Sequence, residues 1–361
     1  MDRIGDHDGV LLSSRAVHDE ISRSVTYEFE DVVAELLNLR IVSPRVPRGP
    51  GLRRRAWWAA RQPRLARRRQ RGCGPRVLIA MGQSIYDLAD QMANLDSIER
   101  ADHRVAYVEE MWRTELPLRR DLRLLLDRFD HVFLGLAGTC QELDEVIAPP
   151  VSYLPPALNL QRFVGGYEPA RVIDVYAMGR RNPAHHEVLL EWAAERGAFY
   201  HFDTIVGPRV QDLAEHRAHL IDLIRRTSYF MVNEAKVDQP EQRGTQSEIA
   251  YRYFEGAAAG AILLGPIPDT PMFSELFPWE DAVIPVAHDG TDLVPTLDEL
   301  SGDRERVRRA RRAGIRGAID AHDVAHRVRS IMQTLDLPEP PGVSERINRL
   351  RNLAAGREAS L

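Results

Sequence analysis

The chain of 361 residues contains little cysteine and has no long apolar run. Its two cysteines, Cys73 and Cys140, form no metal-binding or disulfide spacing pattern, and they favour a reducing compartment. No apolar stretch has the length needed to span a bilayer. The N-terminal MDRIGDHDGV lacks the basic segment and apolar run of a signal peptide. We therefore expect a cytoplasmic protein, with peripheral contact to a membrane left open.

Lysine is almost absent, since Lys236 is the only one, and the positive charge is carried by arginine. The net charge of −5 gives no general attraction to nucleic acid, and we expect no nucleic-acid partner. Apolar residues make up 44% of the chain and charged residues 28%, an ordinary globular composition. A chain of this length is sufficient for two domains, each with its own core.

Short apolar runs alternate with longer helical patterns, which predicts an α/β fold. The first series of predicted strands covers Gly9–Leu12, Leu39–Val42, Arg76–Ala80, Arg104–Val108, His131–Leu134 and Val151–Leu154. The second series covers Arg171–Met178, Phe199–Phe202, Tyr229–Asn233, Ala261–Leu264 and Ala282–Pro285, with a helix predicted over Glu248–Ala259. The two series predict two doubly wound domains. We place an N-terminal domain at residues 1–165, a C-terminal domain at 166–335 and a terminal helix at 336–361 that packs back across the junction.

A basic insertion at residues 45–75, or an unusually basic helix there, interrupts the first series. Arg45 to Arg71 contains eleven arginines and no acidic residue, with Trp57 and Trp58 inside it. A solvated basic loop is the simplest interpretation. Contact with a membrane surface is a second one, because tryptophan and arginine suit the interface of anionic lipid. A docking site for an acidic acceptor or protein is the third, and nucleic acid is the least favoured because no recognition motif accompanies the charge.

The segment Arg243–Gly265 combines a small polar loop, a helix and a buried strand. Such a loop and helix N-terminus suit close approach by a phosphate group. On the predicted helix Glu248, Arg252 and Glu255 are spaced by four and three residues, so they share one face. An exposed carboxylate such as Glu255 can accept hydrogen bonds from both hydroxyls of a ribose. The segment therefore predicts a site for a nucleotide. A plain alanine-rich core helix with a solvated glutamate is the alternative.

The sequence of this segment, YRYFEGAAAGAILLG, resembles the donor motif of retaining GT-B glycosyltransferases of the family-1, spore-maturation-type branch. The segment VYAMGRRNPAHHEVLLEWA resembles the first strand, Gly-Arg turn and helix of their donor domain, and YLPPALNLQRF resembles their interdomain segment. The resemblance covers roughly residues 150 to 290. It implies the GT-B fold, with two facing Rossmann-like domains and a cleft between them, and a nucleotide-diphosphate sugar as donor.

The resemblance also implies roles for individual residues. Glu255 is then the ribose-binding glutamate, and Arg252 lies near the diphosphate. The donor-binding set as a whole is Gly179, Arg180, Arg181, Lys236, Gln246, Ser247, Arg252 and Glu255. Two departures from the family pattern concern the sugar contacts. Six residues instead of seven separate Glu248 from Glu255, so that Ser247 occupies the family position. The lysine that usually follows the Gly-Arg turn is missing, and Lys236 is either its replacement or an unrelated surface residue.

Acidic residues at the end of a first-domain strand are candidates for the acceptor side. Glu109 and Glu110 follow the apolar run VAYV, and polar groups at the carboxyl ends of parallel strands face a ligand crevice. We take Glu109, Glu110 and Glu248 as catalytic candidates. His18 and Asp19, after the first strand, are weaker ones. Two solvated glutamates in a loop are the alternative interpretation.

Together these features predict a glycosyltransferase of the hexosyltransferase type. It moves a sugar from a nucleotide-diphosphate sugar to an acceptor hydroxyl, and the resemblance implies retention of configuration without a metal ion or other cofactor. A nucleotide-sugar epimerase or hydrolase on the same fold is one alternative. A catalytically inactive binding subunit is another. We expect the nucleotide sugar and an unidentified acceptor as partners, with membrane-surface contact through Arg45–Arg71.

Overall fold

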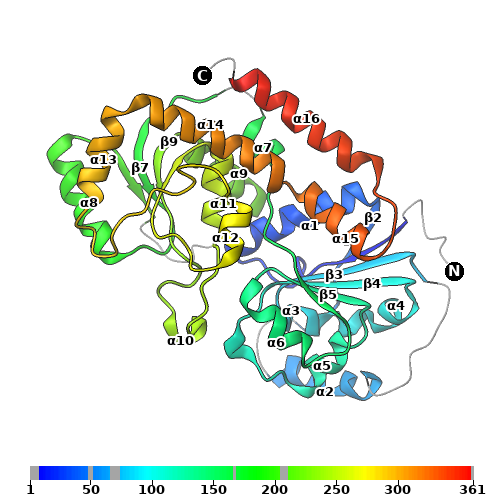
Figure 1. Ribbon diagram of the computed structural model, residues 1–361. Helices are drawn as coiled ribbons and strands as arrows, with labels where there is room; N and C mark the ends of the chain where they lie inside the picture. The colour runs from blue at the N-terminus through cyan, green and yellow to red at the C-terminus, as the bar shows by residue number, and fades with distance from the viewer. Residues whose placement is uncertain (1–7, 48–51, 66–73, 166–167, 204–209, 359–361) are drawn as a thin grey trace. The chain divides into compact units, whose positions relative to one another are not determined.

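The computed structural model describes residues 8–47, 52–65, 74–165, 168–203 and 210–358. The chain divides into two compact units, the first made of Met1–Pro156 with Arg327–Val343 and the second of Ala157–His326 with Ser344–Leu361. The division at Pro156 lies before the boundary predicted at residue 165. The chain re-enters the first unit within α15 (Val324–Thr334) and returns to the second within α16 (Pro341–Glu358) (Figure 1).

Unit 1 contains a six-stranded parallel sheet in the order β2-β1-β3-β4-β5-β6. The strands are β1 (Gly9–Leu12), β2 (Leu39–Val42), β3 (Val77–Ser84), β4 (His103–Glu110), β5 (His131–Leu134) and β6 (Val151–Tyr153). Because β2 and β3 lie on opposite sides of β1, the winding of the chain reverses there. Ligands of open α/β sheets bind at the carboxyl ends of the strands beside such a reversal, here between β1 and β3.

The helices of unit 1 cover its sheet and explain why the central parts of its strands are apolar. A parallel sheet is buried on both faces, so its strands read as continuous apolar runs instead of alternating ones. Leu78, Ala106, Val108 and Leu134 all lie in one buried cluster. The helices are α1 (Ser24–Leu36), α2 (Leu52–Leu65), α3 (Ile85–Asp90), α4 (Leu95–Arg100), α5 (Arg120–Leu126) and α6 (Cys140–Asp144).

The basic insertion forms a packed helix, α2, in its described part. The indole Nε1 of Trp58 donates a hydrogen bond to Asp90 Oδ1 at 3.1 Å, and Gln62 Nε2 donates to Asp121 Oδ2 at 3.0 Å. The guanidinium of Arg61 lies 3.8 Å from the ring centroid of Trp57, a cation–π contact. The expectation of a solvated loop is therefore wrong for residues 52–65. The rest of the predicted insertion, residues 48–51 and 66–73, lies outside the described residues.

Unit 2 contains a four-stranded parallel sheet in the order β10-β9-β7-β8. Its strands are β7 (Ile173–Ala177), β8 (Tyr200–Phe202), β9 (Thr227–Met231) and β10 (Ile262–Leu264). The strand predicted over Ala282–Pro285 is reduced to a single bridge between Ile284 and Leu264. The winding reverses between β7 and β9, so this is the position at which the sheet predicts a ligand site.

Helices surround this sheet, and α11 (Tyr251–Ala259) lies against both the sheet and α14 (Arg304–Ala321). The alanine-rich sequence of α11 follows from this packing. A Cβ atom on Gly256 would lie 2.3 Å from Leu263 Cδ2, and Gly260 ends the helix with a positive φ of 67°. The other helices are α7 (Gln161–Val164), α8 (Pro183–Arg196), α9 (Leu213–Arg225), α10 (Pro240–Arg243), α12 (Pro271–Leu276) and α13 (Leu293–Gly302).

A buried ion pair fastens the C-terminal helix α16 within unit 2. Arg346 donates from Nε to Asp323 Oδ1 at 2.7 Å and from Nη2 to Oδ2 at 3.0 Å. The same carboxylate accepts hydrogen bonds from the backbone N–H groups of Leu160 and Ala325. All the donors that this buried carboxylate needs are therefore supplied by protein groups, a condition under which a buried ion pair is tolerated.

Candidate functional site

The turn after β7 lies at the reversal point of the unit 2 sheet. Gly179 adopts a φ of +67°, which favours glycine. Its N–H donates to Asp203 Oδ2 at 2.6 Å, and Arg181 Nη1 donates to the carbonyl oxygen of Asp203 at 2.6 Å. The guanidinium of Arg181 also lies 5.3 Å from the ring centroid of Phe202. Arg181 is thus held at the end of β8, where its contacts position the turn.

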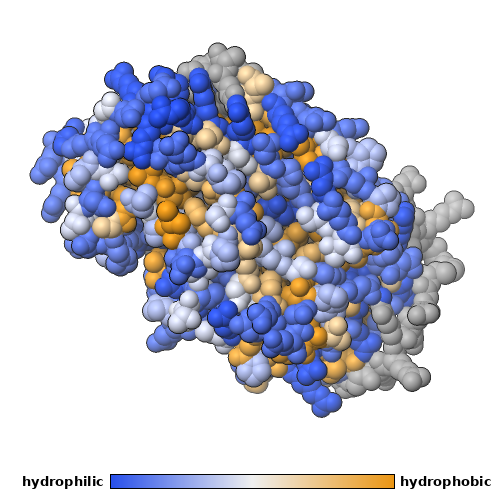
Figure 2. Space-filling view, in the orientation of Figure 1, coloured by the Kyte–Doolittle hydropathy of each residue, from blue (hydrophilic) through white to orange (hydrophobic). Residues whose placement is uncertain are grey.

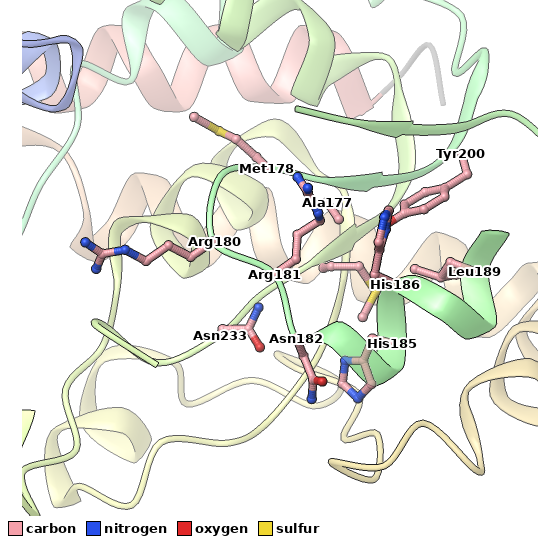
Figure 3. Close-up of a pocket in the computed structure, with 11 residues that line it drawn as sticks. Ala177, Met178, Arg180, Arg181, Asn182, His185, His186, Leu189, Tyr200 and Asn233 are labelled. Carbon is pink, nitrogen blue, oxygen red and sulfur yellow. The ribbon is translucent and has the colours of Figure 1, made fainter. Parts of the chain in front are cut away.

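A pocket opens beside this turn, at the carboxyl ends of β7 and β9. Figure 3 shows Arg180 and Arg181 leaving the turn in different directions, with Asn233 beside them. Arg180 is half exposed, and its Nε lies 3.1 Å from Asp238 Oδ1. The N-terminus of α8 also borders the pocket, but Asn182 caps it by accepting from the N–H of Ala184 at 3.0 Å. That helix end is therefore already partly satisfied by the protein.

The N-terminus of α11 is less completely satisfied. Its first flanking residue is Ala250, and no side chain caps the helix. Arg252 lies in the first turn, and its Nη2 is 3.9 Å from where a Cβ of Gly179 would stand. Arg252 and the Gly179 turn are therefore neighbours, as the sequence motifs predict. An uncapped helix N-terminus with an arginine beside it is a suitable place for an anion.

Glu255 is buried, whereas the sequence interpretation took it as an exposed carboxylate. It forms ion pairs with Arg217, which is also buried, and with Arg252 Nη1 at 2.5 Å. Burial would raise the pKa of Glu255, but the charges of Arg252 and Arg217 and their hydrogen bonds outweigh it and lower the pKa. Exposure of Glu255 was wrong because the helix face that carries it is turned toward α9 and the sheet. Its contact with a ribose stays a prediction.

The loop before α11 contains the next three predicted residues. The sequence predicted Glu248 on the face of this helix. The helix begins at Tyr251, so Glu248 lies before it instead. Glu248 is buried and accepts a hydrogen bond from Gln246 Nε2 at 2.6 Å. Ser247 Oγ accepts from the N–H of Asp269 at 2.9 Å. These contacts order the loop, and they place Glu248 inside the protein.

Lys236 lies in the turn between β9 and α10. Its φ of +54° is in the left-handed region, and its carbonyl oxygen accepts from the N–H of Gln239 at 2.9 Å. The same turn carries Asp238, the ion-pair partner of Arg180. The turn that carries Lys236 is therefore linked to the Gly-Arg turn by the ion pair between Asp238 and Arg180. Its contact with a donor stays a prediction.

In unit 1 the two predicted carboxylates end β4. Glu109 is buried, and its Oε2 accepts a hydrogen bond from Thr26 Oγ1 of α1. Glu110 is half-buried at the last register position of β4, opposite Ser84. The side chain of Glu109 thus faces α1 on one side of the sheet, whereas Glu110 lies at the carboxyl end of the strand. Successive strand residues point to opposite faces, and the sequence does not say which face is open.

A polar cluster at the carboxyl ends of β1 and β3 was only partly found from the sequence. His18 Nε2 lies 3.4 Å from Asp87 Oδ1 and 3.6 Å from Asp90 Oδ2, and both carboxylates are buried. Arg23 Nη1 contacts Asp87 Oδ2 at 2.6 Å. The cluster lies at the reversal point of this sheet. Asp87 also serves the N-terminus of α3, and that capping pattern was the one signal that the sequence offered.

Glu30 beside this cluster makes stability depend on pH. Its Oε2 accepts from Ser13 Oγ at 2.5 Å and from Arg15 Nη2 at 2.9 Å, and burial raises its pKa to about 7. Between about pH 4.5 and 7 the folded state then holds a proton that the unfolded state has lost, so stability falls as pH rises. Glu30→Gln should flatten this fall, by on the order of 3 kcal/mol across the window, in urea unfolding at a series of pH values. An unchanged pH profile would contradict the assignment.

A model of a known protein family matches a region that lies mainly in unit 2. Residues 180–333 match the family model described as glycosyl transferase-like. No curated protein matches the sequence. The chain has the GT-B fold. The matched residues contain Arg180 of the Gly-Arg turn, α11 and the loop before it, so the predictions of a GT-B fold and of a glycosyltransferase are confirmed at that level.

Two solved structures show the fold over nearly the whole chain. One is an alpha-glucosyltransferase in complex with UDP-glucose and DNA containing an abasic site, with 12% identity, 91% of this chain and 98% of that chain covered, and a TM-score of 0.56. The other is an alpha-glucosyltransferase in complex with UDP and a 13-mer DNA containing a central A:G mismatch, with 11% identity, the same coverage and a TM-score of 0.53.

One sequence prediction is corrected by these comparisons. The exclusion of nucleic acid as a partner is wrong, because both of these proteins of the same fold are in complexes with DNA. Net charge averages over the whole chain, so it does not report on one surface.

Among the described residues, no group of three or more His, Cys, Asp or Glu side chains is arranged to hold a metal ion. No helix in the described ranges has the length and apolar character needed to cross a membrane.

Proposed function

We propose that the protein transfers a sugar from a nucleoside-diphosphate sugar to an acceptor hydroxyl, with retention and without a metal ion. The observation that carries the proposal is the uncapped N-terminus of α11, with Arg252 and the Gly179 turn beside it, at the reversal point of a glycosyl transferase-like sheet. This is the arrangement that a leaving diphosphate requires, because backbone N–H groups and a guanidinium there stabilise its growing negative charge.

Arg252 is proposed as the principal side-chain contact of the diphosphate. Its Nη1 is held by Glu255, and its Nη2 is directed to the Gly179 turn. A guanidinium fixed by a buried carboxylate loses little further freedom when a phosphate binds. Glu255 then has a positioning role through Arg252, in addition to the predicted contact with ribose. Arg180 is the second candidate contact, since its ion pair with Asp238 is half exposed and readily exchanged for a phosphate.

Retention is supported by the resemblance of the donor motif to retaining enzymes. In the proposed step the bond between the anomeric carbon and the diphosphate oxygen breaks, and the acceptor oxygen bonds to that carbon on the same face. The acceptor proton passes to an oxygen of the leaving diphosphate, so that no separate base is needed. If the product is inverted instead, a base is required. The His18 cluster is then the first candidate, because Glu109 is buried beneath α1.

The donor and acceptor are proposed from the solved structures of this fold. UDP-glucose is the first donor to test, since the similar alpha-glucosyltransferases are complexed with UDP-glucose or UDP. DNA is an acceptor class to include, because both are also complexed with DNA. At their low identity these likenesses show the fold alone, so the panel must contain other sugars and carbohydrate acceptors.

The function is tested with purified protein and a panel of nucleotide sugars, with and without EDTA. We expect one donor to raise the thermal midpoint and to be turned over with an acceptor, with EDTA having no effect and NMR of the product showing the donor's anomeric configuration. Inhibition by EDTA or an inverted product would overturn those parts of the proposal. Donor consumption without any glycosylated product would favour the epimerase or hydrolase. A protein that no nucleotide sugar stabilises would contradict donor binding altogether.

A further inference from the structure

A second pocket in unit 2 is lined by arginine, and the proposed transfer reaction does not use it. It has a volume of about 270 Å³ and lies between the end of α13, the first turns of α14 and Tyr229 of β9. Figure 2 shows that the surface over α13 and α14 is strongly hydrophilic. We call it the arginine pocket; its lining residues are Tyr229, Leu300, Ser301, Arg304, Val307, Arg308 and Arg311.

The three arginines share one face of α14. Arg304, Arg308 and Arg311 are spaced by four and three residues, which places their side chains in one row along the helix. Seven residues of helix extend over about 10 Å, so the row presents positive charge over that length. Arg311 is anchored, because its Nε donates to the carbonyl oxygen of Gly260 at 2.9 Å. The row is therefore a cationic surface beside a cavity, with Arg311 held in place at one end.

Two acidic residues near α14 form ion pairs with an arginine that lies outside the pocket. Arg306, which does not line the pocket, contacts Asp281 at 2.7 Å and Glu299 at 2.8 Å. On the pocket side Glu305 pairs with Arg308. Among the described residues, neither Arg304 nor Arg311 forms an ion pair. A charge run on an exposed helix is usually solvated, but two of these three arginines line a cavity without a carboxylate partner among the described residues.

Further positive charge lies behind the pocket. Arg171 is largely buried, and its guanidinium donates to the carbonyl oxygens of Thr227 at 2.5 Å and Ala259 at 2.8 Å. Burial, with the charges of Arg311 and Arg225, lowers the pKa of Arg171 to about 9. The neighbouring arginines thus repel one another in a partly desolvated place, and the ion pair of Arg171 with Glu168 at 3.2 Å offsets part of that repulsion. An anion bound in the pocket would relieve this repulsion.

We propose that the arginine pocket binds a ligand that carries several phosphate groups, held by Arg304, Arg308 and Arg311. Guanidinium groups match phosphate oxygens in a planar, two-point geometry, and the hydroxyl of Tyr229 is a further donor in the lining. A single phosphate does not reach along a row of about 10 Å, so the ligand has more than one anionic group. A polynucleotide backbone and a free polyphosphate share this chemistry, and the experiment distinguishes these two sources.

The test compares two variants that lose the same charge from the same helix. R304Q/R308Q removes two arginines of the pocket. R309Q/R316Q removes two exposed arginines of α14 that do not line it. The probes are a short, fluorescently labelled single-stranded oligonucleotide and inorganic tripolyphosphate, with the full chain. Binding is measured by anisotropy and calorimetry over a series of salt concentrations.

We expect the pocket variant to bind at least one probe tenfold or more weakly than the wild type, and the control variant to bind it as the wild type does. For the single-stranded oligonucleotide, the slope of log affinity against log salt should fall by about 1.4 in R304Q/R308Q, about 0.7 for each lost phosphate contact. An effect on tripolyphosphate alone identifies a free polyphosphate as the ligand. Equal weakening in both variants, or in neither, overturns the proposal. It does so whether or not the protein transfers a sugar.

Discussion

Glu255→Gln is expected to lower the free energy of unfolding by about 3–5 kcal/mol. The reason is Arg217, which is 1% exposed and would lose the carboxylate that balances its charge. Arg252 loses the same partner, but it is partly exposed and water replaces the contact at little cost. Chemical denaturation of the variant and the wild type measures the difference. A loss below about 1 kcal/mol would contradict a structural role for the ion pair.

A double-variant cycle separates the role of Glu255 in folding from its role in donor binding. Replacing Arg217 as well, in R217M/E255Q, removes the unpaired charge, and we expect part of the stability to return. Donor binding is then read as the rise in thermal midpoint of each variant with the nucleotide sugar, relative to its own midpoint without it. If R217M/E255Q responds to the donor as the wild type does, Glu255 contributes to donor binding neither through ribose nor through its contact with Arg252.

The donor segment shows what the sequence could predict and where it stopped. The resemblance of YRYFEGAAAGAILLG placed a helix and a buried strand correctly, and the close packing of Gly256 against Leu263 explains why that motif is rich in small residues. The burial of Glu255 was out of reach. Its two arginine partners come from α9 and from its own helix, and no local pattern pairs Arg217 with a residue on another helix.

The unit 1 candidates failed for a related reason. Strand β4 was predicted from its apolar run, but the period of two in a strand does not reveal that Glu109 faces α1. His18 was noticed only as a residue after a strand. Its partners Asp87 and Asp90 follow β3, and they lie near His18 because the strand order brings the end of β3 beside the end of β1. Strand order is a long-range property, and composition and spacing along the chain do not determine it.

Arg252→Gln is expected to have the largest effect on the reaction itself. Loss of one charged donor to a leaving group costs about 10²–10³ in rate in enzymes that stabilise an anion in this way. We therefore expect kcat/KM for the best donor to fall by about that factor. Arg252→Lys should be intermediate, because lysine keeps the charge but cannot contact Glu255 and the Gly179 turn with two separate nitrogens.

The control for Arg252 is Arg180→Gln, which removes the same charge from the neighbouring turn. Arg180 is 45% exposed on its side chain and pairs with Asp238. We expect it to affect KM more than kcat, since a flexible exposed arginine contributes to donor binding before and after bond cleavage alike. Unfolding of Arg252→Gln must be measured too, because Glu255 keeps only Arg217 in that variant. If Arg252→Gln folds stably and turns over the donor at the wild-type rate, the diphosphate is not bound at the N-terminus of α11.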